Sequence, residues 1–233
     1  MELLLLALAP GLTIALYIYL RDRYEREPFK ALALTFVLGA LGAIAAAMLE
    51  AAFPYQEKSA TMLATAANAT LVVAPIEETV KFLAVWLLVF RAPVFNEPFD
   101  GVVYCVIASM GFATLENLMY VLGGGMHVAL ERAFVSVPGH AAFGAIMGYY
   151  VGRARFETGG KRRLLLLQGL LYAAIAHGLF DFGLLSRTGW GIACAALTFI
   201  AALILALLAI RASSAESGAF WAAAQPVTAE EHG

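Results

Sequence analysis

Apolar runs of roughly 20 residues recur along this chain and are separated by short polar links. A helix rises about 1.5 Å per residue, so each run can cross a hydrocarbon core about 30 Å thick. The runs are continuous and do not alternate apolar with polar residues, which excludes the strands of a membrane barrel. The hydrophobic fraction is 62% and the charged fraction only 14%. The sequence therefore predicts an all-α, polytopic bundle of transmembrane helices in a lipid bilayer.

Seven spans are expected, at about residues 2–20, 31–52, 71–90, 101–122, 132–151, 164–185 and 189–210. Their orientation follows from the basic residues, which favour the cytoplasmic side of a membrane. With the N-terminus outside, the inner side receives Arg21, Arg23, Arg26, Lys30, Arg91, Arg153, Arg155, Lys161, Arg162, Arg163 and Arg211. The outer side receives only Lys58, Arg132 and Arg187. We therefore predict an outside N-terminus and a cytoplasmic C-terminus.

The domain organisation expected from composition is simple. Residues 1–211 form one transmembrane domain, and residues 212–233 form a polar, disordered cytoplasmic tail rich in Ala, Ser and Glu. Pro75 either kinks one long helix or begins a new one. Cys105 and Cys194 lie within spans, so both are expected to be reduced packing residues.

The span at 71–90 carries Glu77, Glu78 and Lys81 in its middle. A charge near the bilayer centre costs about 2.5 to 3.5 kcal/mol on insertion scales, so this span is a functional-site hypothesis. Glu77 and Lys81 are four residues apart, which favours an ion pair, whereas Glu78 lies about 100° further round the helix. We therefore expect Lys81 to hold one carboxylate while the other faces a pocket.

Three further spans bring ionisable residues to the same depth. Counted from the expected helix ends, Glu77 and Glu116 lie about 10 Å and 9 Å below the outer edge of the hydrocarbon core. With the same rise per residue, His140 and His177 both lie about 12 Å below the outer edge of the hydrocarbon core. Four helices thus deliver acids and imidazoles to one layer near the outside.

Neighbouring residues can support this layer. Asp181 follows His177 by four residues, so its carboxylate can orient the imidazole. Asn117 stands beside Glu116 as a hydrogen-bonding group. By contrast, Glu50, His127, Glu131 and Arg132 are expected at or outside the membrane interface, in structural roles.

Water activated by a carboxylate is the chemistry that this layer favours. A carboxylate in a dry site can take a proton from water and return it to a leaving amine, while histidines stabilise an oxyanion. Ser109 and Ser136 lack a base at nucleophile spacing, so a covalent mechanism is not favoured. No cofactor is therefore expected.

Two alternatives remain open at this point. Zinc is the possible cofactor, with His140, His177, Glu78 and Glu116 as ligands, although the H-E-x-x-H pattern is absent. A proton- or cation-coupled transporter could use the same residues as a relay, but no inverted internal repeat is visible.

An ordered series of motifs resembles the PrsW family of bacterial intramembrane proteases. The series is Pro75-Ile76-Glu77-Glu78-Thr79-Val80-Lys81, Asp100-Gly101, Gly111-Phe112-Ala113-Thr114-Leu115-Glu116-Asn117, Pro138-Gly139-His140 and His177-Gly178-Leu179-Phe180-Asp181. That family is distantly similar to the CAAX and bacteriocin-processing membrane proteases. The resemblance covers most of the chain.

The resemblance implies hydrolysis of a peptide bond in a single-span membrane protein, near the extracytoplasmic face of a bacterial inner membrane. An anti-sigma factor in stress signalling is the kind of substrate it suggests, and nucleic acid is not an expected partner. By motif match, Glu77 and Glu78 activate water, and Glu116, His140 and His177 complete the site. Between a glutamic and a metalloprotease mechanism, we expect the glutamic one.

Overall fold

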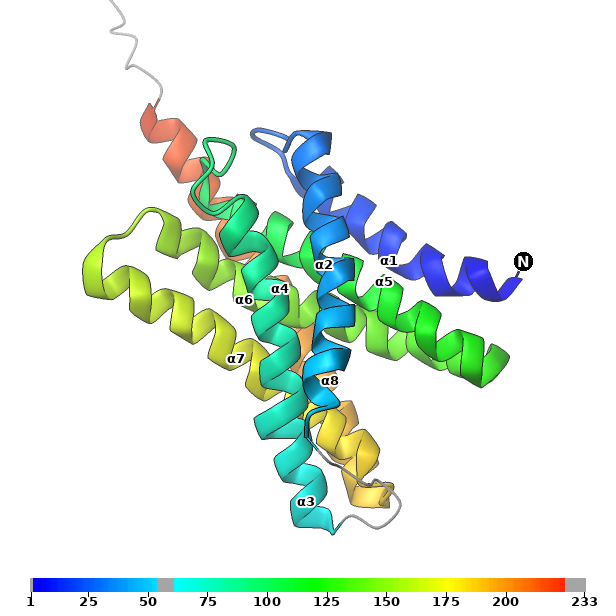
Figure 1. Cartoon of the computed structure of the whole chain (residues 1–233). Helices are drawn as coiled ribbons and strands as arrows, with labels where there is room; N and C mark the ends of the chain where they lie inside the picture. Colours follow the sequence, from blue (N-terminus) through cyan, green and yellow to red (C-terminus); the bar gives the residue numbers. More distant parts are fainter. Residues whose placement is uncertain (1, 54–60, 225–233) are drawn as a thin grey trace, which may run out of the picture.

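The structure is a computed structural model that describes residues 2–53 and 61–224, which form helices and no strand. The helices form one bundle (Figure 1), and the prediction of an all-α membrane protein is confirmed. The elements are α1 (Glu2–Arg21), α2 (Phe29–Glu50), α3 (Met62–Ala67), η2 (Asn68–Val73), α4 (Ala74–Leu88), α5 (Pro98–Glu131), η3 (Arg132–Ser136), α6 (Val137–Arg155), α7 (Gly159–Leu185) and α8 (Gly189–Ala224).

Five helical stretches are long and apolar enough to cross a membrane: Glu2–Arg21, Phe29–Glu50, Pro98–Arg155, Gly159–Leu185 and Gly189–Ala224. The third stretch contains α5, η3 and α6, for which the sequence predicts two spans. The expected span at 71–90 falls within α3, η2 and α4, which follow one another without a gap. The number of spans and the sides of the two termini stay predictions.

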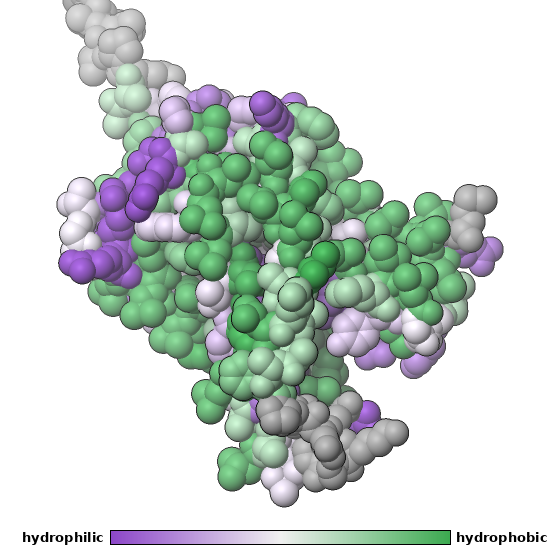
Figure 2. All heavy atoms as spheres, in the orientation of Figure 1, coloured by the Kyte–Doolittle hydropathy of each residue, from purple (hydrophilic) through white to green (hydrophobic). Residues whose placement is uncertain are grey.

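The surface of the bundle is mostly apolar, as expected for helices that face lipid. Figure 2 shows hydrophobic residues over most of the visible face, with hydrophilic residues gathered over the α6–α7 connection. Large hydrophobic side chains are exposed on α1, α2, α5, α7 and α8; Leu12, Leu41, Leu167 and Leu197 are examples. In water, such a surface would lead to aggregation.

Helix α5 is the centre of the bundle. It packs against α1, α2, α4, α6 and α8, and every residue from Phe99 to Thr114 is buried. Glycines allow the close approach: a Cβ on Gly148 of α6 would lie 2.4 Å from the Gly101 carbonyl oxygen, and one on Gly111 would lie 1.9 Å from that of Phe36 in α2. Small residues therefore set the distances between these helices.

Two π-helical segments, η2 and η3, each run into a proline. Pro75 and Pro138 lie in the first turns of α4 and α6, and residues 71 and 134, four positions earlier, belong to η2 and η3. Proline has no N–H to donate to the carbonyl group four residues earlier, and its ring clashes with that carbonyl group. The helical turn before each proline therefore widens. Pro75 thus begins α4 without interrupting the helical path.

Two expected boundaries differ in the structure. The span expected at 101–122 continues in α5 as far as Glu131, with the helical backbone of α5 interrupted at Gly125 (φ 71°, ψ −158°). The expected disordered tail is instead helical as far as Ala224, where α8 ends, and Ser213 and Ser217 are buried. Residues 225–233 and the polar link at 54–60, with Lys58, lie outside the described residues. Cys105 and Cys194 are free, as expected.

Candidate active site

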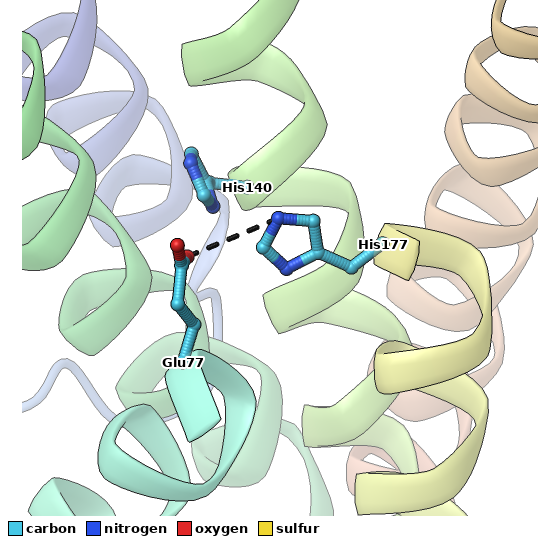
Figure 3. Close-up of side chains that lie close together, drawn as sticks. All are labelled: Glu77, His140 and His177. Carbon is cyan, nitrogen blue, oxygen red and sulfur yellow. Dashed lines mark ion pairs between the residues drawn. The ribbon is translucent and has the colours of Figure 1, made fainter. Parts of the chain in front are cut away.

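Acidic and imidazole side chains from four helices meet at one point inside the bundle. Glu77 of α4, His140 of α6 and His177 of α7 each place one ligand atom within 4.8 Å of the others (Figure 3). Glu78 and Glu116 join them through hydrogen bonds to the two histidines. The structure thus brings together all five predicted catalytic residues.

A cavity of about 400 Å³ lies beside this cluster. Its walls come from α2, η2, α4, α5, η3, α6 and α7, and the ionisable residues that line it are Glu50, Glu77, Glu116, Glu131, Arg132, His140, His177 and Asp181. The cavity therefore has room for several water molecules or a short stretch of polypeptide beside the acids.

Lys81 binds both glutamates of the Glu77-Glu78 pair. Its Nζ lies 3.3 Å from Glu77 Oε2 and 2.8 Å from Glu78 Oε1, and the lysine side chain is 1% exposed. The expectation that Lys81 would hold only one carboxylate is wrong, because residues three and four apart on a helix are both within reach of a long side chain. The Phe112 ring, 4.2 Å from Nζ at its centroid, contacts the other side of the ammonium.

Both nitrogens of His177 face carboxylates. Nδ1 lies 2.9 Å from Glu78 Oε1, and Nε2 lies 3.2 Å from Asp181 Oδ2 and 3.8 Å from Glu77 Oε2. A carboxylate only accepts hydrogen bonds, so the ring donates to both sides only as an imidazolium. Asp181 takes the supporting position that its spacing predicted.

His140 has the opposite surroundings. Its Nδ1 lies 2.9 Å from the ammonium of Lys81, which can only donate, and its Nε2 lies 2.9 Å from Glu116 Oε2, which accepts. This pattern fixes a neutral ring with its proton on Nε2. The two histidines, 5.1 Å apart at their ring centroids, thus offer one positive and one neutral imidazole.

Arg132 belongs to the site, although it was expected at the membrane interface. Its Nη2 lies 2.7 Å from Glu116 Oε2, its Nε donates to Asn117 Oδ1 at 3.2 Å, and its guanidinium stacks over Tyr120. The interruption at Gly125 and the turn in η3 fold the residue back over α5. Asn117 in turn donates to the Ala7 carbonyl of α1 at 2.9 Å, which is a structural role.

Glu50 is a second residue that sequence reasoning placed at the interface. It lines the cavity, and its Oε1 is buried without a hydrogen-bond partner. The depth count used for Glu116 could not have found it, because Glu50 lies only two residues, about 3 Å, from the expected end of its span.

The two adjacent glutamates differ in access to the cavity. Glu77 is 5% exposed and lines the cavity wall, whereas Glu78 is 0% exposed and lies behind it, between Lys81 and His177. Glu77 can therefore contact water in the cavity directly.

The donor set also fits a zinc ion in type and spacing. Two histidines and one carboxylate are a common catalytic zinc set. The second nitrogens of the two rings have carboxylate partners, because His140 Nε2 bonds to Glu116 and His177 Nδ1 bonds to Glu78. The sequence predicted Glu78 and Glu116 as the carboxylate ligands of such an ion. In the structure, Glu77 is the carboxylate that lies beside the two histidines. The ammonium of Lys81, however, already lies between Glu77 and His140.

Buried acids and imidazoles within a helical membrane bundle are typical of membrane-embedded enzymes and of ion-coupled transporters. Comparison with known proteins is more specific: residues 27–211 match the family described as PrsW family intramembrane metalloprotease. The chain belongs to this family of intramembrane proteases.

Its relatives cover most of its length. It is 38% identical over 183 residues to the Protease PrsW of Geobacillus kaustophilus, covering 78% of this chain and 80% of that protein. It is 34% identical over 209 residues to that of Shouchella clausii, with 90% and 94% covered. It is 33% identical over 183 residues to that of Bacillus subtilis, with 78% and 83% covered. No solved structure matches the chain.

Proposed function

We propose that this protease hydrolyses a peptide bond of a single-span membrane protein with water activated by Glu77. The observation that carries the proposal is the meeting of three glutamates and two histidines from four helices beside one cavity. The membrane of a bacterial cell is the proposed location, and an anti-sigma-factor-like protein is the proposed class of substrate.

In the proposed reaction, the Glu77 carboxylate removes a proton from a water molecule in the cavity, and the resulting hydroxide attacks the carbonyl carbon of the peptide bond. The His177 imidazolium stabilises the negative charge that develops on the carbonyl oxygen. Glu77 then returns the proton to the leaving amine nitrogen as the C–N bond breaks. Glu78 and Lys81 hold the base and the imidazolium in position through their hydrogen bonds.

Neither Ser109 nor Ser136 gives a competing nucleophile. The Ser109 hydroxyl is buried and has no hydrogen-bond partner among the described residues, so none of them is in position to remove its proton. Ser136 lines the cavity, but it has no hydrogen bond to a histidine or carboxylate within the part of the chain that the structure describes.

A zinc-dependent reaction is the second candidate, because Glu77, His140 and His177 would be suitable ligands. Such an ion would supply a polarised water molecule at neutral pH. Lys81 favours the first candidate, because its positive charge lies next to two of those three ligands.

The test reconstitutes the purified protein in liposomes with a single-span reporter protein. We expect cleavage by the wild type and none by Glu77→Gln, with Glu157→Gln, an exchange at the α6–α7 connection, as the matched control. An intact reporter with the wild type, together with cation flux across the liposomes, would point to a transporter.

A second arm separates the two mechanisms. A zinc-selective chelator is added while Mg²⁺ remains present, and cleavage is followed over time. Cleavage that continues unchanged supports glutamate-activated water. Complete inhibition that added zinc reverses would replace it with the metal mechanism.

A further inference from the structure

A second cluster of buried acids lies at the other end of α5. It comprises Asp22 from the α1–α2 link, Glu27 from the same link and Asp100 from the first turn of α5. One carboxylate oxygen from each lies within 4.8 Å of the others. Their exposed fractions are 1%, 3% and 0%, so water solvates none of them appreciably.

Protein groups account for only part of the hydrogen bonding in this acidic cluster. Asp100 Oδ2 accepts from the backbone N–H groups of Asn96 and Glu97 as part of the N-terminal cap of α5, and Glu27 accepts from the Tyr104 hydroxyl. Among the residues that the structure describes, both oxygens of Asp22 and Oδ1 of Asp100 are buried without a hydrogen bond of standard geometry. The Glu27 backbone N–H lies near enough to Asp22 to lower the pKa of its carboxyl. Helix capping therefore explains why one oxygen of Asp100 is buried, but it does not explain why the Asp22 carboxyl is buried.

Arg26 is the basic residue whose charge lowers the pKa of Asp22, but it forms no ion pair with the cluster in the described part of the chain. Among residues 2–53 and 61–224, no lysine, arginine or histidine forms an ion pair with Asp22, Glu27 or Asp100. Glu97 adds a fourth buried carboxyl beside them, with its Oε1 unpartnered. Buried carboxylates are normally paired with a cation or coordinate a metal.

The donor atoms identify the class of ligand. All are oxygens, with no sulfur or imidazole nitrogen, and oxygen sets suit hard cations such as Mg²⁺, Ca²⁺ and Mn²⁺. We propose that Asp22, Glu27 and Asp100 bind one hard divalent cation that fastens the α1–α2 link to the start of α5.

The position of the cluster gives the cation a structural role. The α1–α2 link, the start of α5 and the last turns of α8 lie at the same end of the molecule (Figure 1). The Trp221 indole of α8 donates to Glu97, and the Phe99 N–H donates to Ser217 Oγ of α8 at 2.9 Å. A cation here connects the α1–α2 link to the start of α5, which in turn bonds to α8, and it does so whether or not the proposed proteolytic mechanism is correct.

The test measures thermal unfolding and metal binding with the full chain in detergent, after removal of metals by a chelator. In the wild type we expect Mg²⁺, Ca²⁺ or Mn²⁺ at a hundredfold excess over its Kd to raise Tm by about 5 to 10 °C relative to Na⁺ at equal ionic strength. Electron paramagnetic resonance of free Mn²⁺ should show one ion bound per chain that Mg²⁺ displaces.

The decisive variant is Asp22→Asn, which removes one charge and keeps the shape of the side chain. Its Tm without divalent cations should equal or exceed that of the wild type, because an unpaired buried charge is gone, and the cation-induced rise should disappear. Glu25→Gln, which changes an exposed acid on the same link, should keep the full rise. Glu77→Gln should also keep it, which separates this site from the active site.

Two results would overturn the proposal. One is a wild-type Tm that does not respond to any of the three divalent cations, which would mean that protons alone neutralise the cluster. The other is an undiminished response in Asp22→Asn. If Asp22→Asn does not fold, the Mn²⁺ count on the wild type and on Glu77→Gln decides: one displaceable ion in both supports the site, and none in Glu77→Gln refutes it.

Discussion

The two buried acid clusters of this protein balance their charges in different ways. In the candidate active site, Lys81 lies within 3.3 Å of two glutamates and Arg132 lies 2.7 Å from a third. In the acidic cluster of Asp22, Glu27 and Asp100, the described part of the chain supplies no such cation. The comparison teaches that the active site carries its counter-charges in its own sequence, whereas the acidic cluster must obtain them from solution as metal ions or protons.

The lack of a counter-charge in the acidic cluster also raises the pKa values of its two residues in the α1–α2 link, which lies outside the expected membrane spans. Burial, together with the negative charges of Glu97 and Asp100, raises the pKa of Asp22 to about 7. Burial likewise raises the pKa of Glu27 to about 7. Unpaired carboxyls in a poorly solvated place hold protons more tightly than carboxyls in water.

The largest expected effect tests the division of roles between the adjacent glutamates. Glu77→Gln should lower reporter cleavage by at least about 10³-fold, within the range for loss of a general base. Its Tm should fall less than that of Glu78→Gln, because Lys81 keeps the nearer Glu78 carboxylate. Glu78→Gln should also lower Tm, since Lys81 and His177 lose a charged partner. Cleavage rate and thermal unfolding are measured on both variants; equal Tm losses would contradict the assignment of Glu77 as the base.

Lys81→Met tests whether the active site depends on its own cation. Removing one partner of a buried ion pair typically costs about 3 to 5 kcal/mol, and here two carboxylates lose their cation. We expect lower stability to urea at neutral pH and little or no cleavage. Asp22→Asn is the matched comparison, because it should leave stability unchanged or increase it. A decrease in both variants would remove the contrast between the clusters.

Arg132 gives a smaller effect, because it contacts Glu116 at the edge of the site and is partly exposed. Arg132→Ala should slow cleavage about 10- to 100-fold. Arg132→Lys should recover part of the loss, because it retains the charge but lacks the planar guanidinium that stacks on Tyr120. Arg163→Ala, an exposed exchange in α7, is the control and should behave as the wild type.

The smallest effect is a pH dependence of stability. Asp22 and Glu27 have ordinary pKa values of about 4 in the unfolded chain and about 7 in the folded one, so the folded protein binds more protons between those values. Their contribution to stability is therefore complete below about pH 4 and decreases as the pH rises to about 7. The other charged groups near Asp22 are Arg26, Glu97 and Asp100.

The measurement compares Tm from pH 5 to pH 8 with a chelator and with Mg²⁺. We expect a fall of a few degrees with the chelator and a smaller fall with Mg²⁺, because metal binding requires deprotonated ligands. Identical profiles under the two conditions would count against a cation in the acidic cluster.

Much of the active site could be predicted from the sequence, because depth in a membrane can be counted along each helix. That count brought Glu77, Glu116, His140 and His177 into one layer, and the structure places them around one cavity. It did not find Arg132, since the interruption at Gly125 and the turn in η3 redirect the chain. It also did not show that Lys81 reaches both glutamates, because that depends on side-chain conformation.

The errors outside the site have a similar cause. The segment after residue 211 has the composition of a disordered tail, yet Ser217 and Trp221 bond to the start of α5, which lies more than a hundred residues earlier. The acidic cluster was not predicted either, since Asp22 and Glu27 stand in a link that reads as solvent-exposed and meet Asp100 only in the folded chain. Contacts between distant segments are not contained in a local pattern.

The widened turns ahead of Pro75 and Pro138 fix the number of residues that these two segments can contain, and not only which residues they contain. Glu77 and His140 each come two residues after one of these prolines. Each residue of a helix turns the next side chain by about 100°, so one deletion in either segment would rotate an active-site residue away from the cavity unless the turn tightened. Insertions and deletions just before these prolines should therefore be tolerated less well than most substitutions there.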